Sequence, residues 1–416
     1  MCAVRLSRPL LGLNVRRRQL SKNYYVLSNG RLQRESNGLS VINATGMKRA
    51  IPVEDVESLY IYGEVDINTK LLNFLSQKRI TLHVFNYYGF YSGSYYPREY
   101  LNSGYLLVKQ VEAYQDSSQR LHLCREFVRG AAHSIVRNIS YYSNRKGTGA
   151  QTDESDTPRG EVTPITEPEA SPYHPVSEEA EAAVDSGLQL AKLDEGGDSD
   201  PLACIVDMFP EELPGLEQLR NTIEAIVPLI DTQQDVNNLR GIEGKIRERY
   251  YQSWAHILAE DWVFTRRVRR PPDNEVNALI SFGNSMLYTV CLAEIYRTQL
   301  SPTISYLHEP GTRRFSLALD LSEVFKPIIV DRVIFKLINT GQLRPDHFDK
   351  SLDGCYLAED GRKLFLSALE EKLASTIKHR RLGRHVSYRH LIRLECYKLV
   401  RSLTGIESYR AFRAWW

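Results

Sequence analysis

The spacing of hydrophobic residues changes near Tyr100, and this change constrains the fold more than any other feature. Before it, short runs rich in Val, Ile, Leu and Tyr alternate with Asn-Gly and Gly turns, as is typical of β-strands. After it, apolar residues recur every three or four positions, which indicates amphipathic helices. The division predicts an α+β chain, with a small N-terminal β-sheet domain followed by a larger all-α domain.

The β-sheet domain is expected at residues 21–100. Strands are predicted at 24–27, 31–34, 39–43, 48–53, 58–62 and 81–85, with one helix at 68–77. Asn29-Gly30 lies between the first two runs and is a strong local signal for a hairpin that joins them. Residues 1–20 carry five arginines but lack the apolar core of a signal peptide, so we interpret them as an N-terminal extension.

The helical domain is expected at residues 101–416, with long helices at 101–114 and 117–142. Residues 146–200 interrupt it and are rich in Glu, Asp, Pro, Ser, Thr and Gly. Too few large apolar residues occur there to offset the entropy lost on ordering, so the stretch is predicted to be a disordered acidic insertion. Two interpretations of its role stay open: an inert linker, or a tethered polyanion that competes with nucleic acid.

The charge is divided unevenly along the chain. The formal net charge is +2, yet residues 151–200 contain fourteen acidic and two basic residues, which leaves the remainder at +14. A chain of that charge is a candidate for binding polyanions. Two basic clusters are the candidate DNA-binding residues, with solvated charged faces as the alternative: Arg266, Arg267, Arg269 and Arg270, and Lys378, Arg380, Arg381, Arg384 and Arg389.

The sequence favours a cytoplasmic protein without a membrane span. Its six cysteines form no CxxC pair and are expected to be free thiols in a reducing compartment. The longest uncharged runs, 80–97 and 276–293, are interrupted by polar residues, and the second is predicted to be a buried core helix.

Three short stretches in the helical half carry candidate catalytic residues. Glu243 stands between two glycines beside an apolar helical stripe, and His308 precedes a Pro-Gly turn. Asp320 and Glu323 are three residues apart on one helix face, where half-buried carboxylates repel unless a cation separates them. A site for Mg²⁺ or Mn²⁺ with His308 and Glu243 would resolve this conflict. Each residue alone also fits a structural role, and the pair could instead be neutralised by Arg313 or Arg314.

Taken together, these stretches resemble the CRISPR-associated integrase family, the universal endonuclease-integrase of spacer acquisition. The resemblance runs in order from Asn23 to Trp416, apart from the acidic insertion, and is carried by LRGIEGKIRERYY, RRVRRPPDNEVNALISFGNSMLY, ISYLHEPGTRRFSLALDLSEVFKPIIVDRVIF and TIKHRRLGRHVSYRHLIRLECYKL. It implies that Glu243, His308 and Glu323 bind the catalytic Mg²⁺ or Mn²⁺ and that Asp320 supports them. It also implies a homodimer formed through the β side and a small ferredoxin-like companion protein.

The activity implied by the resemblance is DNA integration. The 3′-hydroxyl of a captured DNA fragment, carried as duplex or forked DNA, would attack a phosphodiester at the edge of a CRISPR repeat, and hydrolysis would use the same site. Two other classes stay open: a DNA-binding scaffold without catalysis, and a related mobile-element transposase. The transposase usually carries a further C-terminal DNA-binding domain, which this sequence does not show.

Overall fold

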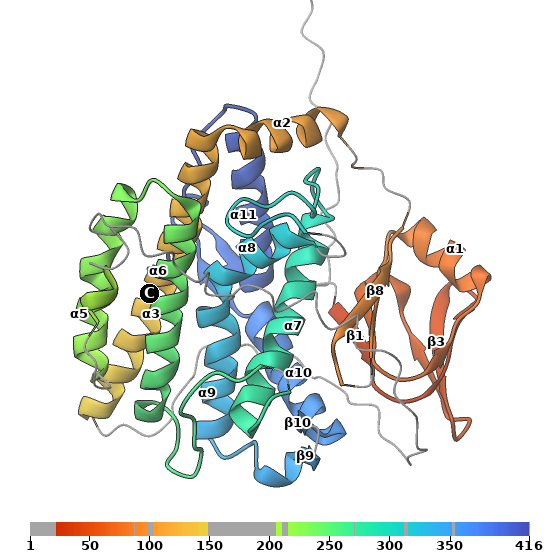
Figure 1. Cartoon of the computed structure of the whole chain (residues 1–416). Coiled ribbons are helices and arrows are strands. Elements are labelled where there is room, and N and C mark those ends of the chain that lie inside the picture. Colours follow the sequence, from red (N-terminus) through yellow and green to blue (C-terminus); the bar gives the residue numbers. More distant parts are fainter. Residues whose placement is uncertain are drawn as a thin grey trace, which may run out of the picture. The chain divides into compact units, whose positions relative to one another are not determined.

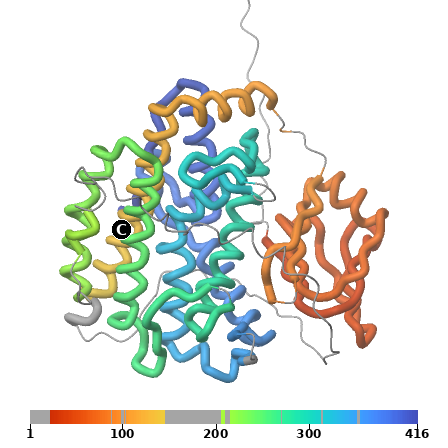
Figure 2. The backbone as a smooth tube through the Cα atoms, in the orientation of Figure 1, coloured from red at the N-terminus to blue at the C-terminus, as the bar shows by residue number. Residues whose placement is uncertain are grey.

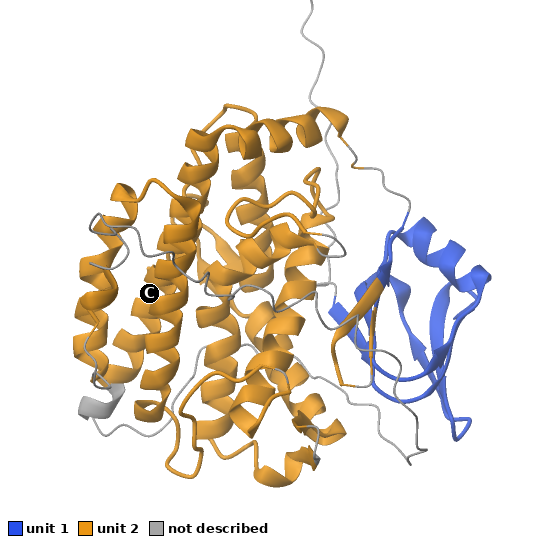
Figure 3. Ribbon diagram, viewed as in Figure 1, with its two compact units in different colours: residues 1–83, 94–98 blue, residues 84–93, 99–416 orange. Residues whose placement is uncertain are grey.

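A computed structural model of the chain describes residues 22–86, 88–97, 101, 103–148, 205–209, 215–269, 271–311, 315–351 and 354–415. In the helix that ends at residue 148, side chains are described as far as residue 144. It divides into two compact units, residues 1–83 with 94–98 and residues 84–93 with 99–416 (Figure 3). The predicted border at residue 100 lies close to this division. The N-terminal extension and nearly all of the predicted acidic insertion lie outside the described residues.

The N-terminal strands form two four-stranded sheets. One has the order β1-β5-β7-β8 and the other β4-β3-β2-β6. Their bounds are Lys22–Val26 (β1), Gly30–Glu35 (β2), Gly38–Asn43 (β3), Lys48–Ile51 (β4), Val56–Ile61 (β5), Val65–Asp66 (β6), Thr81–Phe85 (β7) and Tyr91–Tyr95 (β8), and helix α1 spans Thr69–Lys78. The strand and helix positions agree with the sequence prediction, which missed the two-residue β6, the five-residue β8 and a short 3-10 helix at Val53–Asp55.

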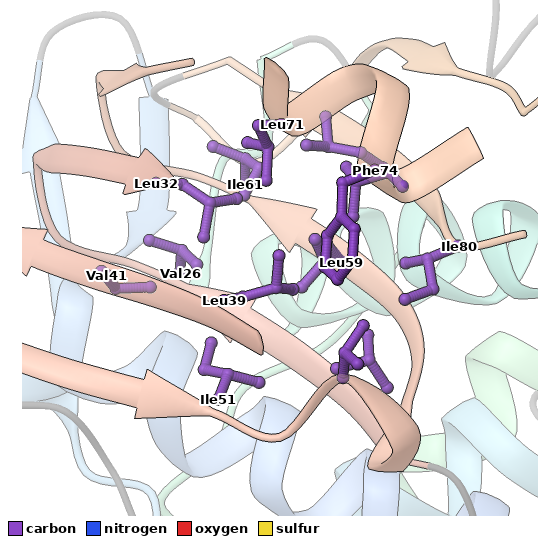
Figure 4. Close-up of a cluster of buried hydrophobic side chains, with 14 residues drawn as sticks. Val26, Leu32, Leu39, Val41, Ile51, Leu59, Ile61, Leu71, Phe74 and Ile80 are labelled. Carbon is purple, nitrogen blue, oxygen red and sulfur yellow. The ribbon is translucent and has the colours of Figure 1, made fainter. Parts of the chain in front are cut away.

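The core of the first unit lies where the strands meet α1. Leu32, Leu39 and Leu59 from the strands and Leu71 and Phe74 from α1 are almost fully buried and point toward one another (Figure 4). Asn68 caps α1 by accepting a hydrogen bond from Leu71 N at 2.9 Å, so the helix begins where the sequence predicts.

The predicted hairpin at Asn29-Gly30 is wrong. Strand β1 pairs in parallel with β5, whereas β2 pairs antiparallel with β3, so these two residues carry the chain between sheets. Both are tied to Glu64, whose backbone N–H donates to Asn29 Oδ1 at 2.8 Å and whose carbonyl accepts from Gly30 N at 2.9 Å. The tight hairpin is instead the one between β2 and β3, where Ser36 adopts a positive φ of 50° before Asn37.

The second unit is built from long helices (Figures 1 and 2). Helix α3 packs against α5, α6 and α8, and α7 packs against α8 and α11. The bounds are Gly104–Gln115 (α2), Ser117–Thr148 (α3), Leu216–Ile226 (α5), Val236–Gln252 (α6), Glu275–Ile295 (α7), Ser316–Lys326 (α8), Arg332–Asn339 (α9), Glu359–Ala374 (α10) and Tyr388–Leu403 (α11). Asp116 caps α3, with its Oδ1 accepting from Ser118 N at 2.9 Å, so the helix begins at the predicted residue 117.

Helix α7 is the central core helix. Within the described part of the chain it is the helix long and apolar enough to cross a membrane, but 89% of that apolar window is buried inside the protein. Gly283 lets it pack closely, because a Cβ there would lie 2.5 Å from Val330 Cγ1 and 2.8 Å from Phe365 Cζ. The burial agrees with the prediction of a core helix rather than a span.

The prediction of an all-α second domain is incomplete. Two small antiparallel hairpins lie among the helices, β9 (Phe348–Ser351) with β10 (Gly354–Leu357) and β11 (Thr376–Lys378) with β12 (His385–Ser387). Runs of three or four residues are too short to show a two-residue period against the helical pattern around them. The described cysteines, Cys124, Cys291, Cys355 and Cys396, are free, as the sequence predicts, and they are buried.

Candidate active site

Helices α6 and α8 and the loop before α8 bring the three predicted ligands together. Glu243 lies on α6, Glu323 lies on α8, and both carboxylates contact the same guanidinium, that of Arg247. His308 lies close enough for its charge to act on both carboxylates. The exposed fractions are small, 9% for Glu243, 8% for His308 and 7% for Glu323, so the cluster sits at the edge of the core rather than on an open surface.

Asp320 holds the loop that carries His308. Its carboxylate is fully buried and accepts three backbone N–H groups, from Tyr306 at 2.7 Å, Leu307 at 3.1 Å and His308 at 3.0 Å. His308 Nδ1 lies 2.7 Å from Asp320 Oδ1, an oxygen that also accepts the His308 backbone N–H, so Nδ1 is the donor and carries the proton. Nε2 is then the nitrogen available to a ligand, as in carboxylate–histidine–metal triads.

The predicted repulsion between Asp320 and Glu323 is wrong, because the carboxylate of Asp320 is hydrogen-bonded to the loop that carries His308. Asp320 is satisfied by the loop, and the two carboxylates that face each other are those of Glu243 and Glu323. Burial raises the pKa of Glu243, and the nearby charge of Glu323 raises it further. Burial also opposes ionisation of Glu323, but Lys326, Arg247 and His308 together outweigh it and lower the pKa of that carboxyl.

The cations that separate this pair were not predicted. Arg247 Nη2 donates to Glu243 Oε1 at 3.2 Å and also to Glu323 Oε2, while Lys326 pairs with Glu323 Oε1. Both lie one helical turn after a glutamate, a spacing at which side chains meet, so the sequence held a signal for them. The alternative partners named from the sequence, Arg313 and Arg314, lie outside the described residues.

His308 also responds to this environment. Burial lowers the tendency of its imidazole to be charged, but the hydrogen bond to Asp320 and the charges of Asp320, Glu323 and Glu243 outweigh it, so the pKa of His308 is raised. The surrounding carboxylates therefore favour positive charge on the imidazole of His308.

The donor set suits a hard divalent cation. Two carboxylates and one imidazole with a fixed tautomer are ligands that Mg²⁺ and Mn²⁺ accept. In the described residues no group of three His, Cys, Asp or Glu side chains is arranged to hold a metal ion. In this structure Glu243 and Glu323 form ion pairs with Arg247 and Lys326 instead. The residue types of the site therefore fit a divalent cation, although the two glutamates are paired with basic side chains here.

The two basic clusters differ in how many of their side chains face solvent. Lys378, Arg380, Arg381 and Arg384 are exposed on and around the β11–β12 hairpin, as is Arg266 on the loop before α7, where Arg269 is half-buried. Arg381 pairs with Glu407 at 2.8 Å, and the guanidinium of Arg380 lies 5.3 Å from the Trp415 ring centroid.

Two of the predicted DNA-binding arginines serve the fold instead. Arg267 is half-buried and donates to Asn277 Oδ1 at 3.1 Å and to Ser281 Oγ at 2.8 Å, which ties its loop to α7. Arg389 Nη2 contacts Glu370 at 2.5 Å with little of its side chain exposed. These contacts argue against phosphate binding by Arg267 and Arg389, and Arg270 lies outside the described residues.

Comparison with known proteins gives concordant results over nearly the whole chain. The family profile described as "CRISPR associated protein Cas1" matches residues 24–164 and 208–371, leaving out much of the acidic stretch. A protein of Thermodesulfovibrio yellowstonii named CRISPR-associated endonuclease Cas1 3 is 42% identical over 95% of this chain and 100% of its own length.

Solved structures give the same result. A Cas1 protein from Thermotoga maritima superposes with a TM-score of 0.69 at 33% identity, covering 94% of this chain and 99% of the other. A casposase bound to integration product has a TM-score of 0.68 at 16% identity, covering 94% and 93%, which shows a shared fold alone. The matches in sequence and in structure establish that the chain belongs to the CRISPR-associated Cas1 family.

Proposed function

We propose that this chain is a metal-dependent DNA endonuclease and integrase of CRISPR adaptation, which inserts captured DNA into a CRISPR array by transesterification from a 3′-hydroxyl. The observation that carries the proposal is the buried set of Glu243, His308 and Glu323, with the imidazole of His308 held by Asp320. The name endonuclease borne by a relative 42% identical to this chain supports the nuclease class.

Each residue of the set has a definite task. Glu243 and Glu323 would hold the divalent cation through carboxylate oxygens, and His308 would hold it through Nε2. Asp320 fixes the histidine tautomer and the loop, so the imidazole needs no reorganisation during the reaction. A bound Mg²⁺ or Mn²⁺ supplies Lewis-acid stabilisation of charge on the attacked phosphate and the leaving oxygen. Attack by water instead of a 3′-hydroxyl gives hydrolysis at the same residues.

Substrate affinity comes from basic side chains away from the cluster. Arg266 and Arg269 on one loop, and Lys378, Arg380, Arg381 and Arg384 on the β11–β12 hairpin, bind phosphates of duplex or forked DNA and of the CRISPR repeat without reading sequence. The working form in the cytoplasm is a homodimer joined through the β-sheet unit, together with a small ferredoxin-like companion protein.

The two alternative functions are less well supported. The casposase likeness extends to fold at 16% identity, against 42% identity to a Cas1 endonuclease, so a transposase is disfavoured. A scaffold without catalysis gives no reason for two facing glutamates to be buried beside an oriented histidine.

A strand-transfer assay tests the proposal. Labelled duplex with 3′-hydroxyl ends is mixed with the chain, the companion protein and a supercoiled plasmid carrying a CRISPR repeat, in Mn²⁺, Mg²⁺ or excess chelator. Joined product is expected only with metal, and Glu243→Gln should abolish it. Glu248→Gln is the matched control, because Glu248 is an exposed glutamate on the same helix that pairs with Lys245 at 3.1 Å. Metal-independent joining, or normal joining by Glu243→Gln, would contradict the proposal.

A further inference from the structure

Arg247 occupies the carboxylates that the proposed cation needs. Its Nε and Nη2 donate to Glu243 Oε1 at 3.3 and 3.2 Å, and Nη2 also contacts Glu323 Oε2. Only 7% of the side chain is exposed, so the guanidinium cannot turn out into solvent. Its remaining nitrogen, Nη1, is buried and makes no hydrogen bond within the described residues.

A second buried group, Asp331, lies close enough to Arg247 for their charges to interact. Asp331 is 1% exposed, and neither of its carboxylate oxygens accepts a hydrogen bond of ordinary geometry within the described residues. Burial raises its pKa to about 7, and the charge of Arg247 opposes this increase most. The Tyr250 hydroxyl opposes it less, through a weak hydrogen-bond contact that lies outside ordinary geometry. The neighbouring cation, Arg332, is engaged elsewhere, because its Nε donates to Asn138 Oδ1 at 2.7 Å.

The backbone gives Asp331 its unusual position. Residues Pro327–Asp331 form a π-helical turn between α8 and α9. Pro327 has no N–H, so the carbonyl of Glu323 loses its α-helical donor, and a wider turn follows directly after the helix that carries the ligand. Such π-turns occur frequently at functional sites. Asp331 ends the turn, buried and poorly hydrogen-bonded in the described part of the chain, which is costly for a carboxylate that only supports packing.

We propose that Asp331 is a positioning residue that receives the guanidinium of Arg247 when a divalent cation takes its place on Glu243 and Glu323. The inference rests on the proposed metal-dependent function. Lys326 has 15% of its side chain exposed and lies nearer to solvent than Arg247, of which 7% is exposed, so Arg247 is the cation that needs a new partner inside the protein. A buried guanidinium stripped of its partners is strongly destabilising. Asp331 supplies the new partner, and Nη1 is the nitrogen already free of hydrogen bonds within the described residues.

The competing arrangement keeps Arg247 on the metal-bound glutamates, through oxygens that the cation does not use. In that arrangement Asp331 makes no difference to metal affinity. The two arrangements therefore predict different effects of Asp331 on metal affinity, which can be measured without DNA and without turnover.

A double-mutant cycle on Mn²⁺ affinity tests the proposal, measured on the full chain by electron paramagnetic resonance of free Mn²⁺. The proteins are wild type, Asp331→Asn, Arg247→Gln and the double variant. Asp331→Asn is expected to weaken Mn²⁺ binding by about tenfold or more, about 1.4 kcal/mol. In the Arg247→Gln background the same change should have no effect, because no guanidinium has to be received. Arg247→Met serves the same comparison if Arg247→Gln does not fold.

The other outcomes are distinct. Equal Mn²⁺ affinity for wild type and Asp331→Asn would overturn the inference and leave the proposed function standing. An equal reduction in both backgrounds would assign Asp331 a merely structural role and also overturn it. If wild type binds no Mn²⁺, the proposed metal-dependent function itself fails. Thermal unfolding without metal checks that each variant is folded.

Discussion

Four hydrogen bonds converge on the carboxylate of Asp320, three from backbone N–H groups and one from the imidazole of His308. This carboxylate couples the conformation of a loop to the orientation of a side chain that we propose binds metal. Removing it altogether leaves buried N–H groups without an acceptor, at about 1–3 kcal/mol each. The residue therefore needs a substitution that separates the two tasks.

Asp320→Asn is expected to keep the chain folded and to reduce strand transfer. The amide oxygen in place of Oδ2 still accepts the N–H groups of Tyr306 and Leu307. The amide nitrogen in place of Oδ1 can accept neither the His308 backbone N–H nor the proton on His308 Nδ1, so the tautomer is no longer fixed. The reduction should be smaller than the complete loss expected for alanine at Glu243, His308 or Glu323. Rates of strand transfer and the midpoint of thermal unfolding are the measurements, and a wild-type rate for Asp320→Asn would contradict the assigned role.

Asp331 is expected to make the metal-free protein less stable as pH rises from about 4 to 7. Its folded pKa of about 7 lies above its unfolded value, so the folded state binds more protons in this range and loses stability with increasing pH. Asp331→Asn should therefore unfold at a higher temperature than wild type at pH 7.5, with the difference shrinking toward pH 4. Asp261→Asn, an exposed aspartate, is the control and should show no such trend. A difference that is constant across this range would contradict the expectation.

The sequence predicted the three residues of the candidate site better than the side chains that surround them. The resemblance pointed to Glu243, His308 and Glu323, and the structure brings these three together. Arg247 was readable in principle, because it follows Glu243 by one helical turn. Asp331 was not, because its position depends on the π-turn after Pro327, which neither the helical period nor local propensity reveals.

At the scale of elements, long periodic segments were predicted well and short pairings were not. Helices α1 and α7 begin and end near the predicted positions, and α3 begins where predicted but ends six residues later, at Thr148. Many residues in each helix repeat the same signal, and a side chain caps each start. The Asn29-Gly30 turn failed as a hairpin because a local turn does not decide which strand its neighbours pair with. That choice comes from contacts distant in sequence, such as those to Glu64.

Close packing of α7 gives a prediction for one glycine. Gly283→Ala is expected to destabilise the protein by about 1–3 kcal/mol, because the added methyl meets Val330 Cγ1 and Phe365 Cζ. Gly104→Ala is the matched control, since a Cβ there meets nothing within 4 Å at the start of α2. That control should be neutral or slightly stabilising. Denaturant unfolding of both variants measures the difference, and equal stability of the two would contradict the packing argument.

For the whole molecule, the dominant feature is the separation of charge along the chain. Outside the acidic stretch the formal charge is +14, and exposed basic residues gather on the β11–β12 hairpin. Only some of the predicted DNA-binding residues are exposed in the structure, because exposure cannot be read from a run of arginines. Arg267 and Arg389 are held by internal contacts, whereas Arg380, Arg381 and Arg384 are exposed.

Replacing Arg380, Arg381 and Arg384 by alanine is expected to weaken duplex binding uniformly across sequences. The slope of log affinity against log salt concentration should become shallower by about 0.9 for each phosphate that the variant no longer binds. A control with alanine at three exposed basic residues elsewhere, Arg31, Lys70 and Arg344, should leave the slope unchanged. Equal slopes for both triple variants and wild type would assign the hairpin to a solvated charged face.

The central claim is that Glu243, His308 and Glu323 act as one metal site for strand transfer. The most direct test is equilibrium Mn²⁺ binding by electron paramagnetic resonance for wild type and the three single alanine variants, on preparations whose duplex affinity is also checked. The account predicts a single bound Mn²⁺ in wild type, its loss in each variant, and duplex binding that stays nearly intact. Undiminished Mn²⁺ binding by His308→Ala would contradict it.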